Sequence, residues 1–84
     1  MEERIREKLL SEFTPALLEV VDDSEAHRGH GGWREGGGTH FNVKIRAAAF
    51  EGLSRVAQQR LVYKVLKAEF DDGLHALALD VGAG

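Results

Sequence analysis

The sequence contains no cysteine. This absence excludes disulfide bonds, thiol nucleophiles and thiolate metal ligands within the chain. A thiophilic metal ion bound to this protein would therefore have to take its sulfur ligands from another molecule.

Long hydrophobic stretches are missing as well. The longest apolar runs span only a few residues, such as residues 47–50, whereas a membrane-spanning helix needs about 20. The N-terminal sequence MEERIR mixes acidic and basic side chains and lacks the apolar stretch of a secretory or targeting peptide. We therefore expect a water-soluble, cytoplasmic protein that does not bind membranes.

Size and composition are those of one small globular domain. The chain has 84 residues, of which 43% are hydrophobic and 30% are charged. This length suffices for a single domain, which we place at residues 1–84. The net charge of −3 argues against tight, non-specific binding to nucleic acid, although it is compatible with a local basic surface.

The N-terminal part of the chain predicts a helix followed by a strand. Residues 2–13 form an amphipathic helical pattern, because their apolar side chains recur about every 3.6 residues. These side chains are Ile5, Leu9, Leu10 and Phe13. Thr14 and Pro15 end the helix. The short, partly β-branched segment 16–21 then predicts a first strand, with a helix as the alternative at its start.

Residues 24–38 form a glycine-rich segment that holds six of the ten glycines of the chain. It also contains His27, His30 and the single tryptophan, Trp33, and it has no apolar periodicity. We predict a long loop, and loops of this length in compact domains are usually either functional or disordered. Trp33 is a candidate contact residue for a partner, because tryptophan is enriched at binding hot spots.

The remaining sequence predicts two more strands and a long helix. Residues 39–46 alternate, with Phe41, Val43 and Ile45 on one face and polar side chains, including His40, on a solvent-exposed face. Residues 55–70 predict the main core helix.

Ser54 is placed to cap the N-terminus of this helix. The expected buried stripe consists of Ala57, Leu61, Val62, Val65, Leu66 and Phe70. Residues 74–81 predict the last strand. An antiparallel hairpin followed by a helical crossover to a parallel strand gives an α+β domain in the order α-β-β-α-β, with the helices on one face of a mixed sheet.

Four segments together resemble the signature of the BolA-like protein family. They are THFNV (39–43), AFEGLS (49–54), QRLVY (59–63) and GLHALAL (73–79). The resemblance extends over nearly the whole chain and implies a class II KH-like fold, α-β-β-α-(α)-β, with a three-stranded sheet. The additional short helix would fall near residues 48–53.

The resemblance also implies a function. Members of this family are partners of monothiol glutaredoxins, with which they share a [2Fe–2S] cluster in iron–sulfur cluster assembly, delivery or iron regulation. Cluster ligands are expected in the loop between the first two strands and at the start of the last strand. In this sequence these positions correspond to His27, with His30 as its substitute, and to His75. The remaining ligands would come from a partner cysteine and from glutathione, and the protein alone would be a monomer.

Each histidine also has a simpler interpretation. His75 can be a half-buried structural side chain that is hydrogen-bonded to the backbone, and His27 can be a solvated loop residue. We nevertheless expect His75 to be a ligand because of the resemblance, and neutral imidazole replaces thiolate on iron in Rieske-type centres. His40, on the solvent-exposed face of its strand, is expected to have a structural or surface role.

No arrangement of catalytic groups is recognisable in the sequence. Asp22, Asp23, Asp71 and Asp72 lie at predicted turns, where aspartate usually binds the backbone. The glycines at 36–38 lack the strand-to-helix context and the lysine of a phosphate-binding loop. We therefore expect a binding protein and not an enzyme.

A KH-like transcription regulator that binds DNA is the alternative from another functional class. A basic surface is expected from Lys44, Arg46, Arg55, Arg60, Lys64 and Lys67. KH domains clamp nucleic-acid backbones with a Gly-x-x-Gly turn between helices. The corresponding turn, residues 52–55, has only the first of the two glycines, which weakens this hypothesis.

Overall fold

The computed structural model describes residues 1–23 and 40–84. The elements in chain order are α1 (Glu2–Phe13), β1 (Leu17–Asp22), β2 (His40–Arg46), the 3-10 helix η2 (Ala48–Phe50), α2 (Arg55–Val65), α3 (Lys67–Asp71) and β3 (Ala76–Gly82). The predicted α+β order is confirmed, and the short helix expected near residues 48–53 is η2. In this part of the chain, no helix has the length and apolar character needed to cross a membrane.

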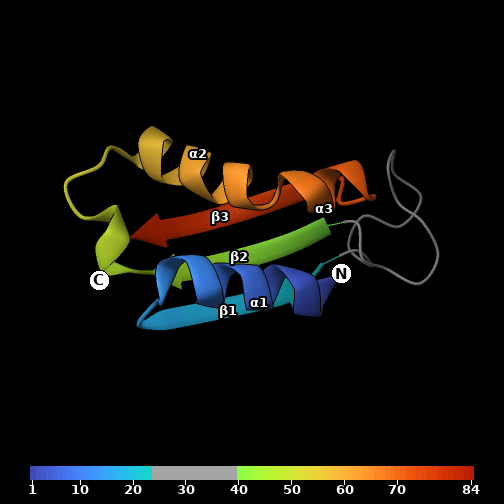
Figure 1. The fold of residues 1–84 in the computed structure, drawn as a ribbon, viewed down its shortest axis with the longest axis horizontal. Helices are drawn as coiled ribbons and strands as arrows, with labels where there is room; N and C mark the ends of the chain where they lie inside the picture. The colour runs from blue at the N-terminus through green and yellow to red at the C-terminus, as the bar shows by residue number, and fades with distance from the viewer. Residues whose placement is uncertain (24–39) are drawn as a thin grey trace.

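The three strands form one mixed sheet in the order β1-β2-β3 (Figure 1). Strand β2 pairs antiparallel with β1 and parallel with β3, so that Val43 lies beside both Val20 and Leu79. The parallel pair is connected through η2, α2 and α3, because parallel neighbours need a crossover connection. Both predicted strand pairings are therefore confirmed.

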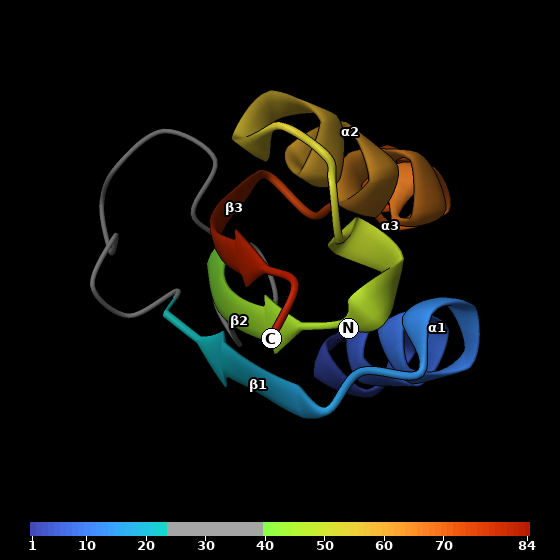
Figure 2. The same ribbon diagram turned by 90° about the vertical axis from the view of Figure 1, so that its left-hand side faces the viewer.

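All helices cover the same face of the sheet, as the end-on view shows (Figure 2). Phe41, Val43 and Ile45 point into this interface and are at most 2% exposed. They pack with Ile5 and Leu9 of α1, among other residues, in one continuous core. The alternation of apolar residues along β2 therefore predicts correctly which side of the strand is buried.

Helix α1 has the predicted bounds and ends at Thr14. The Thr14 backbone is left-handed, with φ 44°, and its N–H donates to the Leu10 carbonyl at 3.1 Å. This conformation closes the helix with a backbone hydrogen bond, and Pro15 follows it immediately. Strand β1 begins at Leu17, so the helical alternative for this segment is wrong.

The long helix predicted for residues 55–70 is interrupted at Leu66, which divides it into α2 and α3. Leu66 has φ −96° and ψ 13°, outside the usual helical region, although its N–H still donates to the Val62 carbonyl at 3.1 Å. Neither glycine nor proline marks this break in the sequence. After the break, α3 ends at Asp71, and the chain then turns through Gly73 toward β3.

The predicted cap and core stripe of this region are confirmed in part. The Ser54 hydroxyl accepts a hydrogen bond from the Ala57 N–H at 3.1 Å, as expected for an N-cap. Of the six apolar residues in the predicted stripe, only Val62 and Leu66 are fully buried. The remaining ones are partly exposed because the helical layer is open to solvent on its outer side.

Candidate functional site

His75 lies between α3 and β3, directly before the first residue of the last strand. It is exposed, whereas the preceding Leu74 is 3% exposed and forms part of the core. The chain reaches this position through Gly73, whose φ of 121° favours glycine, and through the Leu74 N–H, which donates to the Glu69 carbonyl at 2.9 Å. A short, hydrogen-bonded turn therefore presents the His75 imidazole at the surface.

His40 is the first residue of β2 and lies beside this turn. Its ring centroid is 5.3 Å from that of His75, and the two ring planes are inclined by 57°. The two histidines come together because β2 and β3 are parallel and His40 is in register with Ala76. Residues at the beginning of two paired parallel strands lie at the same edge of the sheet.

The prediction that His40 is solvent-exposed is wrong. His40 is 5% exposed and is thus one of the two buried polar or charged residues in the described part of the chain. Alternation correctly places its side chain opposite Phe41, but it does not show what else lies on that side. In the fold, His75 and the start of β3 lie there, and the sequence places these residues far away.

The predicted ligand pair is only partly within the described structure. His27, His30 and Trp33 lie outside the described residues, so the structure does not place them relative to His75. Within residues 1–23 and 40–84, no group of three or more histidine, cysteine, aspartate or glutamate side chains forms a metal site. The two imidazoles of His75 and His40 are the candidate ligands that this region brings together.

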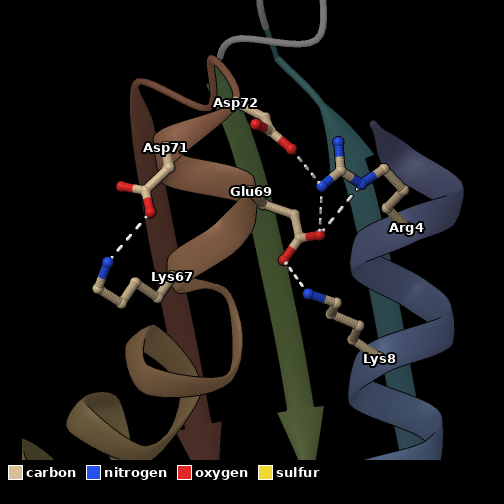
Figure 3. Close-up of polar contacts among 6 residues, drawn as sticks. All are labelled: Arg4, Lys8, Lys67, Glu69, Asp71 and Asp72. Carbon is tan, nitrogen blue, oxygen red and sulfur yellow. Dashed lines mark hydrogen bonds and ion pairs between the residues drawn. The ribbon is translucent and has the colours of Figure 1, made fainter.

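A buried carboxylate of α3, that of Glu69, points toward α1 (Figure 3). Glu69 of α3 has no exposed surface, and its Oε1 accepts a hydrogen bond from Lys8 Nζ at 2.8 Å, while its Oε2 lies 2.9 Å from Arg4 Nη2. Arg4 Nη2 also donates to Asp72 Oδ2 at 2.8 Å. These contacts attach the end of α3 to α1, directly before the chain turns to His75.

The charges around Glu69 determine its protonation state. Burial raises the pKa of the Glu69 carboxyl, but the hydrogen bond and positive charge of Lys8, a local backbone hydrogen bond and the charge of Arg4 outweigh this effect. The net result is a Glu69 pKa below its ordinary value. Glu69 is therefore ionised at neutral pH, in a site that sequence analysis did not identify. Its position in the sequence could have predicted its burial, because Glu69 follows the buried Val62 and Leu66 at helical spacing.

Two of the six predicted basic residues form ion pairs. Arg46 binds Asp80 at 2.8 Å, and Lys67 binds Asp71 at 3.0 Å. In contrast, Lys44 on β2 and three residues of α2 are exposed and form no ion pair within the described ranges; those of α2 are Arg55, Arg60 and Lys64. Of the six predicted basic residues, three of the four without an ion pair in this part of the chain therefore lie on α2.

The comparisons with known proteins agree on one family. Residues 9–83 match the family model described as BolA-like protein. The Arabidopsis thaliana protein BOLA1, chloroplastic, is 49% identical over 78 residues, which are 90% of this chain and 49% of that relative. The Escherichia coli K12 protein named DNA-binding transcriptional regulator BolA is 39% identical over 77 residues, or 92% of this chain and 70% of the relative.

The fold agrees with this relationship. The solved structure of the BolA domain of SufE1 from Arabidopsis thaliana matches with a TM-score of 0.89 and 45% sequence identity, covering 98% of this chain and 90% of that structure. The chain spans about half the length of Arabidopsis BOLA1, so the match concerns a domain of that relative. From the family model, the sequence identities and the fold together, we conclude that this chain belongs to the BolA-like protein family.

Proposed function

We propose that this protein binds a monothiol glutaredoxin through a shared [2Fe–2S] cluster and acts in cluster assembly, delivery or iron regulation. The observation that supports this proposal most directly is the exposed imidazole of His75 at the edge of the sheet, in a chain without cysteine. An exposed donor at this position suits a cluster that two molecules hold together. A partner is then required for any iron–sulfur chemistry at this site.

The donor types present are compatible with such a cluster. Imidazole is an established ligand of [2Fe–2S] iron in Rieske-type centres, and it is a borderline donor that binds iron in its neutral form. His75 would hold the cluster from this chain, with His27 or His30 as the proposed second ligand. A cysteine of the glutaredoxin and the thiol of glutathione would provide the sulfur ligands that this chain lacks.

In this proposal the chain contributes binding and positioning, and we assign no catalytic residue to it. The turn formed by Gly73 and Leu74 fixes the backbone from which His75 extends. The remaining surface around His75 would contact the glutaredoxin, and the protein would be monomeric in its absence. We keep a cytoplasmic location as part of the proposal.

The exposed basic side chains of α2 favour a second function, namely binding to DNA as a transcription regulator. Arg55, Arg60 and Lys64 are available for phosphate contacts, and the Escherichia coli relative is named as a DNA-binding regulator. The turn before α2 has Gly52 in the left-handed region, with φ 78°, but Arg55 occupies the position of the second glycine of a KH clamp. We therefore rank this function below cluster sharing.

Reconstitution distinguishes the two proposals. The protein is mixed with a monothiol glutaredoxin, glutathione, iron and sulfide, and the mixture is analysed by size exclusion and visible circular dichroism. A heterodimer whose cluster spectrum differs from that of the glutaredoxin alone supports the first proposal. If no complex forms with or without the cluster, and if an Arg55→Ala/Arg60→Ala/Lys64→Ala variant loses salt-sensitive DNA binding, the second proposal takes its place.

A further inference from the structure

The imidazoles of His40 and His75 lie next to each other at this edge of the sheet. We propose that His40 and His75 together bind one divalent transition-metal ion of borderline character, such as Co²⁺ or Zn²⁺, with at least two coordination positions left open. This inference rests on the proposed function in taking His75 as a metal ligand. It adds His40, a residue that the sequence pattern assigned to the solvent-exposed face, as the second ligand from this chain.

The distance between the two rings fits a shared metal ion. When two imidazole nitrogens bind one tetrahedral metal at about 2.1 Å each, the ring centres lie about 5 Å apart. The observed separation between the His40 and His75 centroids is 5.3 Å, with the ring planes inclined by 57°. The rings are thus tilted and not stacked, and their separation is close to that of two imidazoles on one tetrahedral ion.

The backbone holds His40 close to its proposed position before any metal binds. His40 pairs in the sheet with Ala76, the residue after His75, and its carbonyl accepts a hydrogen bond from the Asp23 N–H at 2.8 Å. His40 is therefore connected to both neighbouring strands at this edge. A ligand fixed on a strand loses little conformational freedom on binding a metal, which favours affinity.

There is also space next to His40. Among the described residues, a cavity of about 190 Å³ is lined by His40, Asp23, Asn42 and Ala76, among others, but not by His75, so it offers room for water on the His40 side of the ion. His40 is 5% exposed and His75 is exposed, so one ligand is anchored in the protein while the other faces solvent. An ion held this way is accessible from the side of His75.

The number of ligands defines the kind of site. No third histidine, cysteine, aspartate or glutamate joins a metal-binding group in residues 1–23 and 40–84, so this part of the chain provides no closed four-ligand site. Structural zinc sites are closed by four protein ligands, whereas sites that exchange ligands keep open positions. Two nitrogen donors favour the later first-row divalent ions over Mg²⁺ or Ca²⁺, which prefer oxygen. The open positions suit a metal that is passed to, or shared with, a second molecule.

Cobalt titration of the protein alone tests this site. We would titrate Co²⁺ into the wild type and into His40→Phe, His75→Phe and the double variant, and follow the visible absorption of bound Co²⁺ and its displacement by Zn²⁺. Phenylalanine keeps an aromatic ring at the contact but removes the nitrogen. A Glu12→Gln variant is the control, because it removes an exposed carboxylate of α1 and keeps every histidine of the chain.

The expected result is one Co²⁺ per wild-type chain, at least tenfold weaker binding in each single phenylalanine variant, and unchanged binding in the control. Wild-type-like affinity in His40→Phe would overturn the inference, as would equal affinity of wild type and double variant. Should His40→Phe fail to fold, paramagnetic shifts of the His40 imidazole protons in the Co²⁺-loaded wild type decide the question. Their absence would contradict ligation by His40.

This experiment separates the inference from the proposed function. If His40→Phe binds Co²⁺ normally while His75→Phe loses the cluster-bridged heterodimer, the two-imidazole site is wrong and the proposed function stands. If both phenylalanine variants lose Co²⁺ but wild type forms no complex with a glutaredoxin, the site is real and the proposed function is wrong.

Discussion

The carboxylate of Glu69, which has no exposed surface, accepts a hydrogen bond from the ammonium group of Lys8 at 2.8 Å. This contact joins the first helix to the short helix α3, close to the other end of the chain (Figure 3). The backbone carbonyl of the same glutamate accepts the N–H of Leu74, the neighbour of His75. One residue thus connects helix packing with the backbone that presents the candidate ligand.

Removing the cations around Glu69 should destabilise the protein strongly. In an Arg4→Met/Lys8→Met variant the buried carboxylate loses both charged partners, and a buried charge left unpaired costs about 3–5 kcal/mol. Because both cations are partly exposed, we expect a loss near the lower end of this range. Urea unfolding followed by circular dichroism measures the change in the free energy of unfolding.

Arg6→Met is the matched control for this variant. Within the described residues, Arg6 pairs with the partly exposed Glu2 and the exposed Glu3 of its own helix, and such surface pairs contribute about 0.2–1 kcal/mol. Equal destabilisation by Arg6→Met and by the Arg4→Met/Lys8→Met variant would show that the charges around Glu69 have no special role.

The lowered pKa of Glu69 predicts a particular dependence of stability on acid. Its pKa in the folded protein lies below the unfolded value of about 4.3, so its ionisation stabilises the fold above that pH. This contribution is lost as the pH falls through the folded pKa. Between about pH 5 and pH 2 the wild type should therefore lose more stability than Glu69→Gln. Parallel stability curves of the two proteins would contradict this prediction.

The cap of α2 should make a measurable contribution of its own. The Ser54 hydroxyl accepts the Ala57 N–H, and loss of such a cap costs about 1 kcal/mol. Ser54→Ala should lower the free energy of unfolding by this amount in urea. Ser11→Ala, at an exposed position inside α1, is the control and should be neutral or slightly stabilising, because alanine is the better helix former. The assignment of the cap fails if both variants behave alike.

Local patterns were sufficient to predict most of the fold. The bounds of α1 follow from apolar spacing and from Thr14 and Pro15, and the inward face of β2 follows from alternation. Ser54 also has the predicted capping role. Each of these features depends on residues close together in the sequence, where periodicity and capping chemistry apply directly.

Features that depend on contacts between distant segments were not predicted. The contact of His40 with His75 results from parallel pairing of distant segments, and the interruption at Leu66 has no glycine or proline signal. The buried ion pairs of Glu69 were not predicted, because its cationic partners belong to a helix at the other end of the chain. The proposed ligands His27 and His30 remain predictions, since they lie outside the described residues.

The most direct test of the proposed function compares wild type and His75→Ala in cluster reconstitution with a monothiol glutaredoxin and glutathione. His75 is exposed before β3, so its removal should leave the far-ultraviolet circular dichroism unchanged. We predict that the wild type gives a heterodimer with a distinct visible cluster spectrum and that His75→Ala does not. The same heterodimer and the same spectrum with His75→Ala would contradict the proposal that His75 holds the cluster.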